Sequence, residues 1–245
     1  MSTSTPAAPR NGLLNVADVI VAPATAFERL RVVPTWGWAF LVAALLGVAG
    51  LLLMMPAQMH AFDQYGPALY ASQDAVKKLP ADKQQEMIAK MMSFGKMGLQ
   101  FSWIFAPIIF LIGALLQTVI MLIGNAIGKG DGTFKRLWAV AVNVSIIGGI
   151  GLLLTGLIAL VRGPAAFDTP SAVQFALPSL ALLAPGAPVK LGAFLGTISI
   201  TSLWSTYLIA TGMGIVARVP RAVAWITAVV GLLLAACLAA AFAQG

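Results

Sequence analysis

Long apolar runs alternate with short polar segments along the chain, and two of these runs flank the polar turn 128–136. The runs 103–127 and 137–160 contain no Asp, Glu, Lys, Arg or His. Each exceeds the roughly 20 apolar residues that cross a bilayer as a helix. Three further runs meet the same criterion: 36–56, 192–216 and 222–243. The pattern therefore predicts an all-α polytopic membrane helix bundle with five transmembrane helices, in a single domain over residues 11–245.

Charge beside these runs predicts their orientation. The turn 128–136 is short and holds three basic residues against one acid. Short basic loops of membrane proteins face the cytoplasm. We therefore expect this turn, the second basic turn 217–221 and the N-terminus on the cytoplasmic side, with the C-terminus outside. The polar segments 57–101 and 161–191 are then extracytoplasmic loops.

The remaining segments are too short or too polar to span a bilayer. Residues 1–10 are rich in Ser, Thr, Pro and Ala, so we expect a disordered tail. Residues 11–31 mix apolar and charged positions and are divided by Pro23, which predicts two short interfacial pieces. The apolar stretch 171–184, broken by Pro178, is either a re-entrant or an interfacial segment.

Composition places the chain among membrane proteins and excludes other classes. Hydrophobic residues make up 60% and charged residues 9%, whereas a soluble domain carries about 25% charged residues. The net charge of +7 comes from basic residues that mostly flank the apolar runs, as expected beside anionic headgroups. We therefore expect membrane lipids as partners and no nucleic acid. The single cysteine, Cys237, leaves no internal disulfide framework.

No residue pattern predicts catalysis. Apart from Cys237 and Tyr207, the five apolar runs lack ionisable side chains, which counts against ion-coupled transport. His60 is the only histidine, and no serine motif that would pair with it for nucleophilic catalysis is found. The sequence also lacks the cluster of His, Cys or carboxylate ligands that a metal site needs. The glycines of the turn 128–136 follow a membrane helix and lack a Gly-Lys-Ser/Thr sequence, so they are turn glycines. We expect no enzyme, no cofactor and no metal.

Side chains at the cytoplasmic ends of the spans form the first candidate site. Basic residues there can meet acidic protein segments or anionic lipid headgroups. The candidates for such contacts are Phe134, Lys135, Arg136, Arg29 and Arg31. The corresponding function is a non-catalytic integral membrane protein that binds partner proteins or lipids.

Hydroxyl groups concentrate in the fourth apolar run and form the second candidate site. The proposed polar seam comprises Thr197, Thr201, Ser202, Trp204, Ser205 and Thr206. Two interpretations stay open. Either the seam lines a path in an uncoupled translocator or permease for lipids or small solutes, or the hydroxyls bond to their own backbone and to neighbouring helices.

Small residues four positions apart predict close helix contacts. Gly124 and Gly128 form one such pair, Gly192 and Gly196 another, and a ladder of small residues begins at Gly231. These faces serve either internal packing or a homo-oligomer. Three amides in the apolar runs are expected to make interhelical hydrogen bonds: Gln117, Asn125 and Asn143.

Four motifs in order resemble the bacterial branch of the Yip1 domain family. They are Pro-x-x-x-Phe-Glu-Arg-Leu at 23–30, a Met-rich polar helix at 82–97, Gly-Asp-Gly-Thr-Phe-Lys at 130–135, and the Ser/Thr-rich segment 202–212 with its Trp-Ser-Thr-Tyr sequence. The likeness covers roughly residues 15–240.

This resemblance implies a five-span protein of the bacterial cytoplasmic (inner) membrane with a cytoplasmic N-terminus and no established enzymatic site. It places Phe134, Lys135 and Trp204 at motif positions of the family. The vesicle-trafficking and small-GTPase associations of the eukaryotic members are not carried over to this chain.

Overall fold

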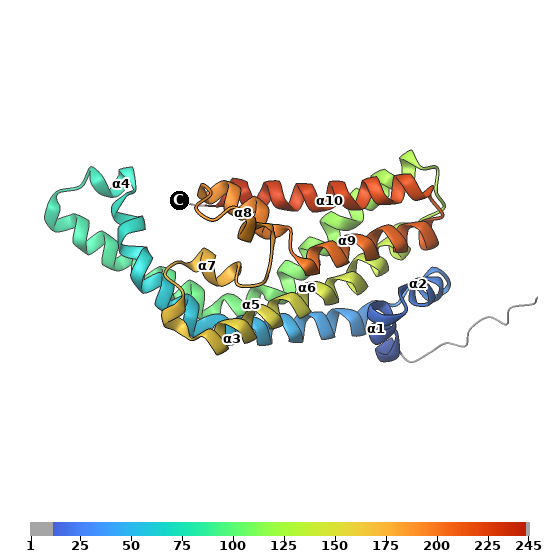
Figure 1. Ribbon diagram of the computed structural model, residues 1–245, viewed down its shortest axis with the longest axis horizontal. Coiled ribbons are helices and arrows are strands. Elements are labelled where there is room, and N and C mark those ends of the chain that lie inside the picture. Colours follow the sequence, from blue (N-terminus) through green and yellow to red (C-terminus); the bar gives the residue numbers. More distant parts are fainter. Residues whose placement is uncertain (1–11, 244–245) are drawn as a thin grey trace, which may run out of the picture. The chain divides into compact units, whose positions relative to one another are not determined.

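The computed structural model describes residues 12–243, which are helical apart from turns, short irregular segments and one isolated bridge (Figure 1). The tail predicted at 1–10 lies outside the described residues. Within residues 12–243, five helices are long and apolar enough to cross a membrane. The all-α membrane architecture predicted from the hydrophobic pattern is therefore confirmed.

These five candidate spans occupy the positions of the five apolar runs, although their bounds differ. The fourth consists of α9 and the π-helical segment η3, which follows it directly. The spans are α3 (Gly37–Ala71), α5 (Ala81–Ile127), α6 (Phe134–Arg162), α9 (Ile200–Gly212) with η3 (Met213–Ala217), and α10 (Arg221–Phe242).

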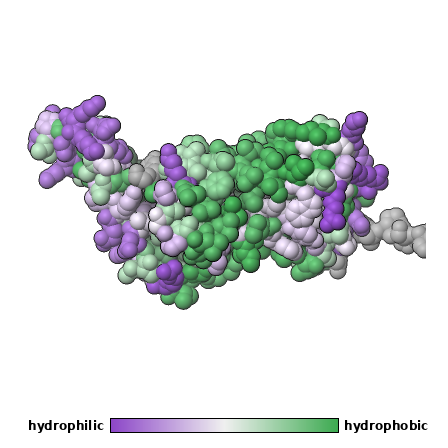
Figure 2. All heavy atoms as spheres, turned by 45° about the horizontal axis from the view of Figure 1, so that its top comes forward, coloured by the Kyte–Doolittle hydropathy of each residue, from purple (hydrophilic) through white to green (hydrophobic). Residues whose placement is uncertain are grey.

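The segment 57–101 is largely a helical hairpin instead of an open loop. Helix α3 continues to Ala71 and α5 begins at Ala81, with the short α4 (Asp74–Lys77) between them (Figure 1). The two arms of the hairpin make side-chain contacts that the hydropathy pattern does not reveal. Lys96 Nζ lies 2.6 Å from Asp63 Oδ1, and polar side chains gather over the tip of the hairpin (Figure 2).

The fourth apolar run is interrupted, whereas the sequence pattern predicts one continuous helix. Helix α8 (Val189–Thr197) ends before α9 begins at Ile200. At the break, the Leu180 amide donates to the Ile198 carbonyl at 3.0 Å. Ser199 forms an isolated antiparallel bridge with Ser179. Thr197-Ile-Ser-Ile-Thr201 combines β-branched residues with hydroxyls that favour non-helical backbone bonds, which accounts for the interruption.

The connection between α6 and α8 contains three short helical pieces. The stretch 171–184 is therefore not one helix, and its Ser179 forms the bridge with Ser199 between α8 and α9. The pieces are η1 (Pro164–Ala166), α7 (Pro170–Gln174) and η2 (Leu180–Leu183).

The chain forms two compact units, each assembled from separate stretches of sequence. The first unit holds both basic turns, and the second holds the hairpin 57–101. The first comprises Met1–Leu45, Pro107–Ile150 and Ile200–Ala235; the second comprises Leu46–Ala106, Gly151–Ser199 and Ala236–Gly245.

In the first unit, the segment before α3 forms two helices, as Pro23 predicts. Helix α1 (Gly12–Val21) packs on α2 (Pro23–Val32), which in turn contacts α9 and η3. Ala26, Phe27 and Leu30 of α2 are buried. The apolar side of α2 thus packs on protein, and it is not available to lipid.

In the second unit, α3 and α6 pack closely beside a buried aromatic side chain. Phe167 is 1% exposed and packs in a cluster with Met54 and Ala159. A Cβ atom built on Gly50 would lie 2.4 Å from the Leu152 carbonyl. The two helix backbones can approach this closely only because Gly50 has no side chain.

Large apolar side chains are exposed along the candidate spans, and Figure 2 shows them over wide areas of the surface. Ile109 of α5 is 64% exposed and Ile226 of α10 is 63% exposed. A water-soluble protein rarely exposes contiguous apolar surface on this scale. The exposed side chains fit a surface that contacts lipid.

Replacing Gly50 with alanine should force α3 and α6 apart. We expect Gly50→Ala to lower the free energy of unfolding by about 1–3 kcal/mol, the usual cost of overpacking. Thermal unfolding of the detergent-purified protein measures this change. Gly98→Ala is the matched control, because a Cβ there meets nothing within 4 Å. Equal stability of the two variants would contradict the close contact.

Candidate functional site

The two basic turns of the first unit are bonded to each other. The Asp131 amide donates to the Ala217 carbonyl at 2.9 Å. Asp131 Oδ2 also lies 3.8 Å from Arg218 Nη1. The turn between α5 and α6 and the turn between η3 and α10 therefore form one surface, although about 80 residues separate them in the sequence.

Asn125 fixes the conformation of the first turn. Its side-chain nitrogen donates to the Gly132 carbonyl at 3.2 Å, and its side-chain oxygen accepts from the Gly132 amide at 3.0 Å. Gly130 donates its amide to the Asn125 carbonyl at 2.9 Å. A Cβ on Gly130 would lie 2.5 Å from the Ala217 carbonyl oxygen. The Gly-x-Gly spacing is thus required by contact between the turns, and these glycines are turn glycines as predicted.

Five basic residues of these turns define what we call the basic surface. Arg136 is half-buried and the other four are exposed. Asp131 is the acidic residue of these turns, and Arg218 partly neutralises its charge. The members of the basic surface are Lys129, Lys135, Arg136, Arg218 and Arg221.

The basic residues stand where the helix dipole disfavours them. Lys135 and Arg136 lie in the first turn of α6, and Arg221 is the first residue of α10. Neither first turn contains an acidic residue. A cation at a helix N-terminus is typically unfavourable by about 0.3–1 kcal/mol. An anion bound between these helix ends would interact favourably with both the side chains and the helix dipoles.

The other predicted contact residues are divided between the surface and the interior. Phe134 is 50% exposed and stacks on Trp138 with ring centroids 6.2 Å apart. Arg29 points inward and forms an ion pair with Asp18. Arg31 is half-buried. Phe134 therefore borders the basic surface, whereas Arg29 already has an internal partner.

A buried polar network links α1 and α2 to α6. Arg29 Nη1 lies 3.4 Å from Asn15 Oδ1, and Asn15 Nδ2 lies 3.5 Å from Asn143 Oδ1. Asn143 Nδ2 donates to the Thr35 carbonyl at 2.9 Å and to the Ala139 carbonyl at 2.8 Å. The predicted interhelical role of Asn143 is confirmed. Its partners on α1 and before α3 were not evident from the sequence, because no short-range spacing connects them.

The hydroxyls of the predicted seam belong to two helices. Thr197 lies on α8 and donates to the Ala193 carbonyl at 3.0 Å. On α9, Thr206 donates to the Ser202 carbonyl at 2.8 Å. Both hydroxyls therefore bond to the carbonyl four residues earlier in their own helix. This matches the interpretation in which the hydroxyls bond to their own backbone and line no solute path. Thr201, Ser202 and Ser205 are half-buried on α9.

Trp204 faces outward and belongs to a row of aromatic rings. It is 39% exposed and stacks on Tyr207, with centroids 5.0 Å apart. Tyr207 in turn lies 6.2 Å from Trp225 of α10. Trp204 is therefore part of the outer face of α9 and α10 in the first unit.

Several small-residue positions serve packing inside the units. A Cβ on Gly124 would lie 2.1 Å from Thr227 Oγ1, and one on Gly231 would lie 2.8 Å from Gln117 Oε1. These contacts join α5 to α10 in the first unit.

Taken together, the uncharged apolar runs of the candidate spans, the exposed apolar side chains and the basic turns define an integral membrane protein with several spans. The Yip1 domain model matches residues 17–243. The chain therefore belongs to the Yip1 domain family, as its motifs suggest. It is also 30% identical over 214 residues to "Membrane protein YknW" of Bacillus subtilis (strain 168), covering 86% of this chain and 82% of that protein. No solved structure matches the chain.

Removing the Asn125 side chain should loosen the first basic turn. We expect Asn125→Ala to raise the hydrogen-exchange rate of the Gly132 amide by about fivefold or more, because a bond worth about 1 kcal/mol or more is lost. Exchange in detergent micelles, followed by mass spectrometry, measures this rate. Asn125→Asp is the matched control, since its carboxylate can still accept from the Gly132 amide. Unchanged exchange in Asn125→Ala would refute the role of this side chain.

Proposed function

We propose that this protein is a non-catalytic membrane protein of the bacterial cytoplasmic membrane that binds an anionic partner on its basic surface. The partner is an acidic segment of a protein or the headgroups of anionic lipids. The basic turns and the N-terminus face the cytoplasm in this proposal, following the charge distribution.

The bonded pair of turns is the observation that carries the proposal. The Asp131–Ala217 hydrogen bond brings together cations from two distant parts of the sequence. Lys135, Arg136 and Arg221 stand at helix N-termini, where the helix dipole disfavours cations and favours a bound anion, which supports a role in binding. Exposed cations of this kind raise association rates and select partners by charge.

The translocator alternative has weaker support. Thr197, Thr206 and Thr211 donate to carbonyls of their own helices. Hydroxyls used in this way stabilise helices and leave fewer donors for a passing solute. The basic surface therefore supports the binding function better than the hydroxyls support transport.

Reversing charge on either turn should release the partner. We expect Lys135→Glu/Arg136→Glu and Arg218→Glu/Arg221→Glu each to reduce capture at least about tenfold, because both turns form one surface. Affinity purification from native membranes into nanodiscs, with mass spectrometry of proteins and lipids, measures the capture and identifies the partner.

The matched control is Lys77→Glu/Lys78→Glu, which makes the same charge change at exposed lysines of the hairpin in the second unit. This control should capture the partner normally. Loss of capture in the control as well would indicate a general charge effect. Normal capture by both turn variants, with folded protein in each, would refute the basic surface as the binding site.

A further inference from the structure

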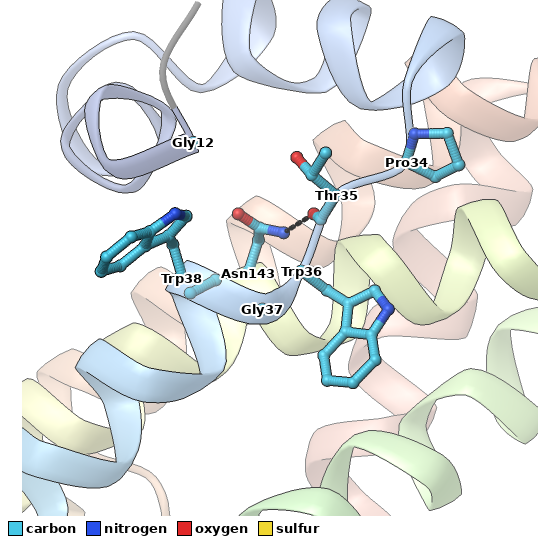
Figure 3. Close-up of a pocket in the computed structure, with 8 residues that line it drawn as sticks. Gly12, Pro34, Thr35, Trp36, Gly37, Trp38 and Asn143 are labelled. Atoms are coloured by element: carbon cyan, nitrogen blue, oxygen red, sulfur yellow. Dashed lines mark hydrogen bonds between the residues drawn. The ribbon is translucent and has the colours of Figure 1, made fainter.

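A pocket of about 430 Å³ lies in the first unit, at the start of α3 (Figure 3). Residues 34–39 of the α2–α3 connection and the first turn of α3 form most of its lining. Gly12 of α1 and Asn143 of α6 complete it. The pocket is separate from the five residues of the basic surface, and it is within the size range of ligand pockets, about 300–1,000 Å³.

The floor of the pocket is held in place by the buried polar network. Asn143 is 2% exposed, and its side-chain nitrogen is shared between the Thr35 and Ala139 carbonyls. Figure 3 shows the Asn143 amide bonded to the Thr35 carbonyl, with the Trp38 indole beside it and the Trp36 indole directed to the other side of the α3 backbone. Gly12 lies against the Trp38 ring, since a Cβ there would come within 2.7 Å of it. The pocket is therefore preformed from three helices and a connection.

The lining offers hydrogen-bond donors and no carboxylate. Trp36 and Trp38 carry indole N–H groups, and Thr35 carries a hydroxyl. Residues 37–39 also line the pocket, and their amides have no acceptor within α3, because they belong to its first turn. Donors without an opposing acid favour an anionic group with several acceptor oxygens, such as a phosphate. A cation would need the carboxylates that are absent from this lining.

The surroundings favour a lipid over a free ion. Tryptophans at the start of a span typically lie at the level of the lipid headgroups. Apolar side chains near the pocket are exposed on both α1 and α3: Leu13 is 49% exposed, Leu14 47%, Leu41 45% and Leu45 61%. Acyl chains can lie along this apolar surface while the headgroup enters the pocket. The volume of about 430 Å³ also far exceeds that of one water-sized species, about 30 Å³.

We propose that this pocket binds the phosphate-containing headgroup of one phospholipid. Trp38 contacts the headgroup beside Asn143, Trp36 borders the same pocket, and the Thr35 hydroxyl and the amides of residues 37–39 bind the phosphate oxygens. The acyl chains follow the exposed leucines of α1 and α3.

Gly37 offers a direct test because it lines the pocket and has free space around it. A Cβ at this position meets nothing within 4 Å. Aspartate and asparagine are both well accepted at the start of a helix. Gly37→Asp places a negative charge beside the phosphate, and Gly37→Asn places a neutral side chain of the same size there.

The experiment is native mass spectrometry of the full chain in detergent, titrated with dioleoyl phosphatidylglycerol. We expect Gly37→Asp to weaken retention of one lipid at least about tenfold through charge repulsion, and Gly37→Asn to stay within about threefold of the unaltered chain. Dioleoylglycerol, which has the same chains without phosphate, should not be retained. Inorganic phosphate alone should compete only weakly.

Several outcomes would overturn the proposal. Equal retention by all three chains would show that the lipid does not occupy this pocket. Equal loss in Gly37→Asp and Gly37→Asn would exclude recognition of phosphate charge, and retention of dioleoylglycerol would do the same. Full competition by inorganic phosphate would assign the pocket to a free anion. Loss on Lys135→Glu/Arg136→Glu, with no response at Gly37, would place the lipid on the basic surface, so this test is independent of the proposed function.

Discussion

The bilayer core contains no water, so every backbone amide and carbonyl within a span needs a partner in the protein. Continuous helices meet this requirement in α3, α5, α6 and α10. The break between α8 and α9 meets it differently, because the Leu180 amide donates to the Ile198 carbonyl. The irregular segment 171–184 thus supplies bonds that a continuous helix would have made for itself. The absence of charged residues from the apolar runs 103–127 and 137–160 has a related cause, because a charge inside the bilayer is costly.

Features set by local pattern could be predicted from the sequence. Five runs of sufficient length, the division at Pro23 and the family motifs led to the correct membrane class and the correct family. The break at Ile198 escaped prediction because its stabilising partner lies near Leu180, outside the apolar run. The residues 197–201 favour an interruption, but hydropathy does not report it, and the hydrogen bond that stabilises the break comes from another segment.

The candidate sites show the same limit. The two basic turns are visible in the sequence, yet the hydrogen bond between Asp131 and Ala217 that joins them depends on how the helices of the first unit are packed. Asn143 is visible as an amide within an apolar run, but Asn15 and Thr35 are more than 100 residues away from it in the chain. The pocket at the start of α3 arises from these long-range contacts, and no local sequence motif predicts it.

The bonds of Asn125 and Asp131 have a consequence for the thermodynamics of association. They fix the backbone that carries the basic surface before any ligand arrives. A flexible loop would lose conformational entropy on ordering, at a cost that subtracts from affinity. A turn already held in one conformation avoids most of that loss, so the proposed binding of an anionic partner would need fewer contacts than binding by a flexible loop. Gly130 and Gly132, whose lack of side chains permits the contact between the turns, would in that case contribute to affinity through the backbone conformation alone.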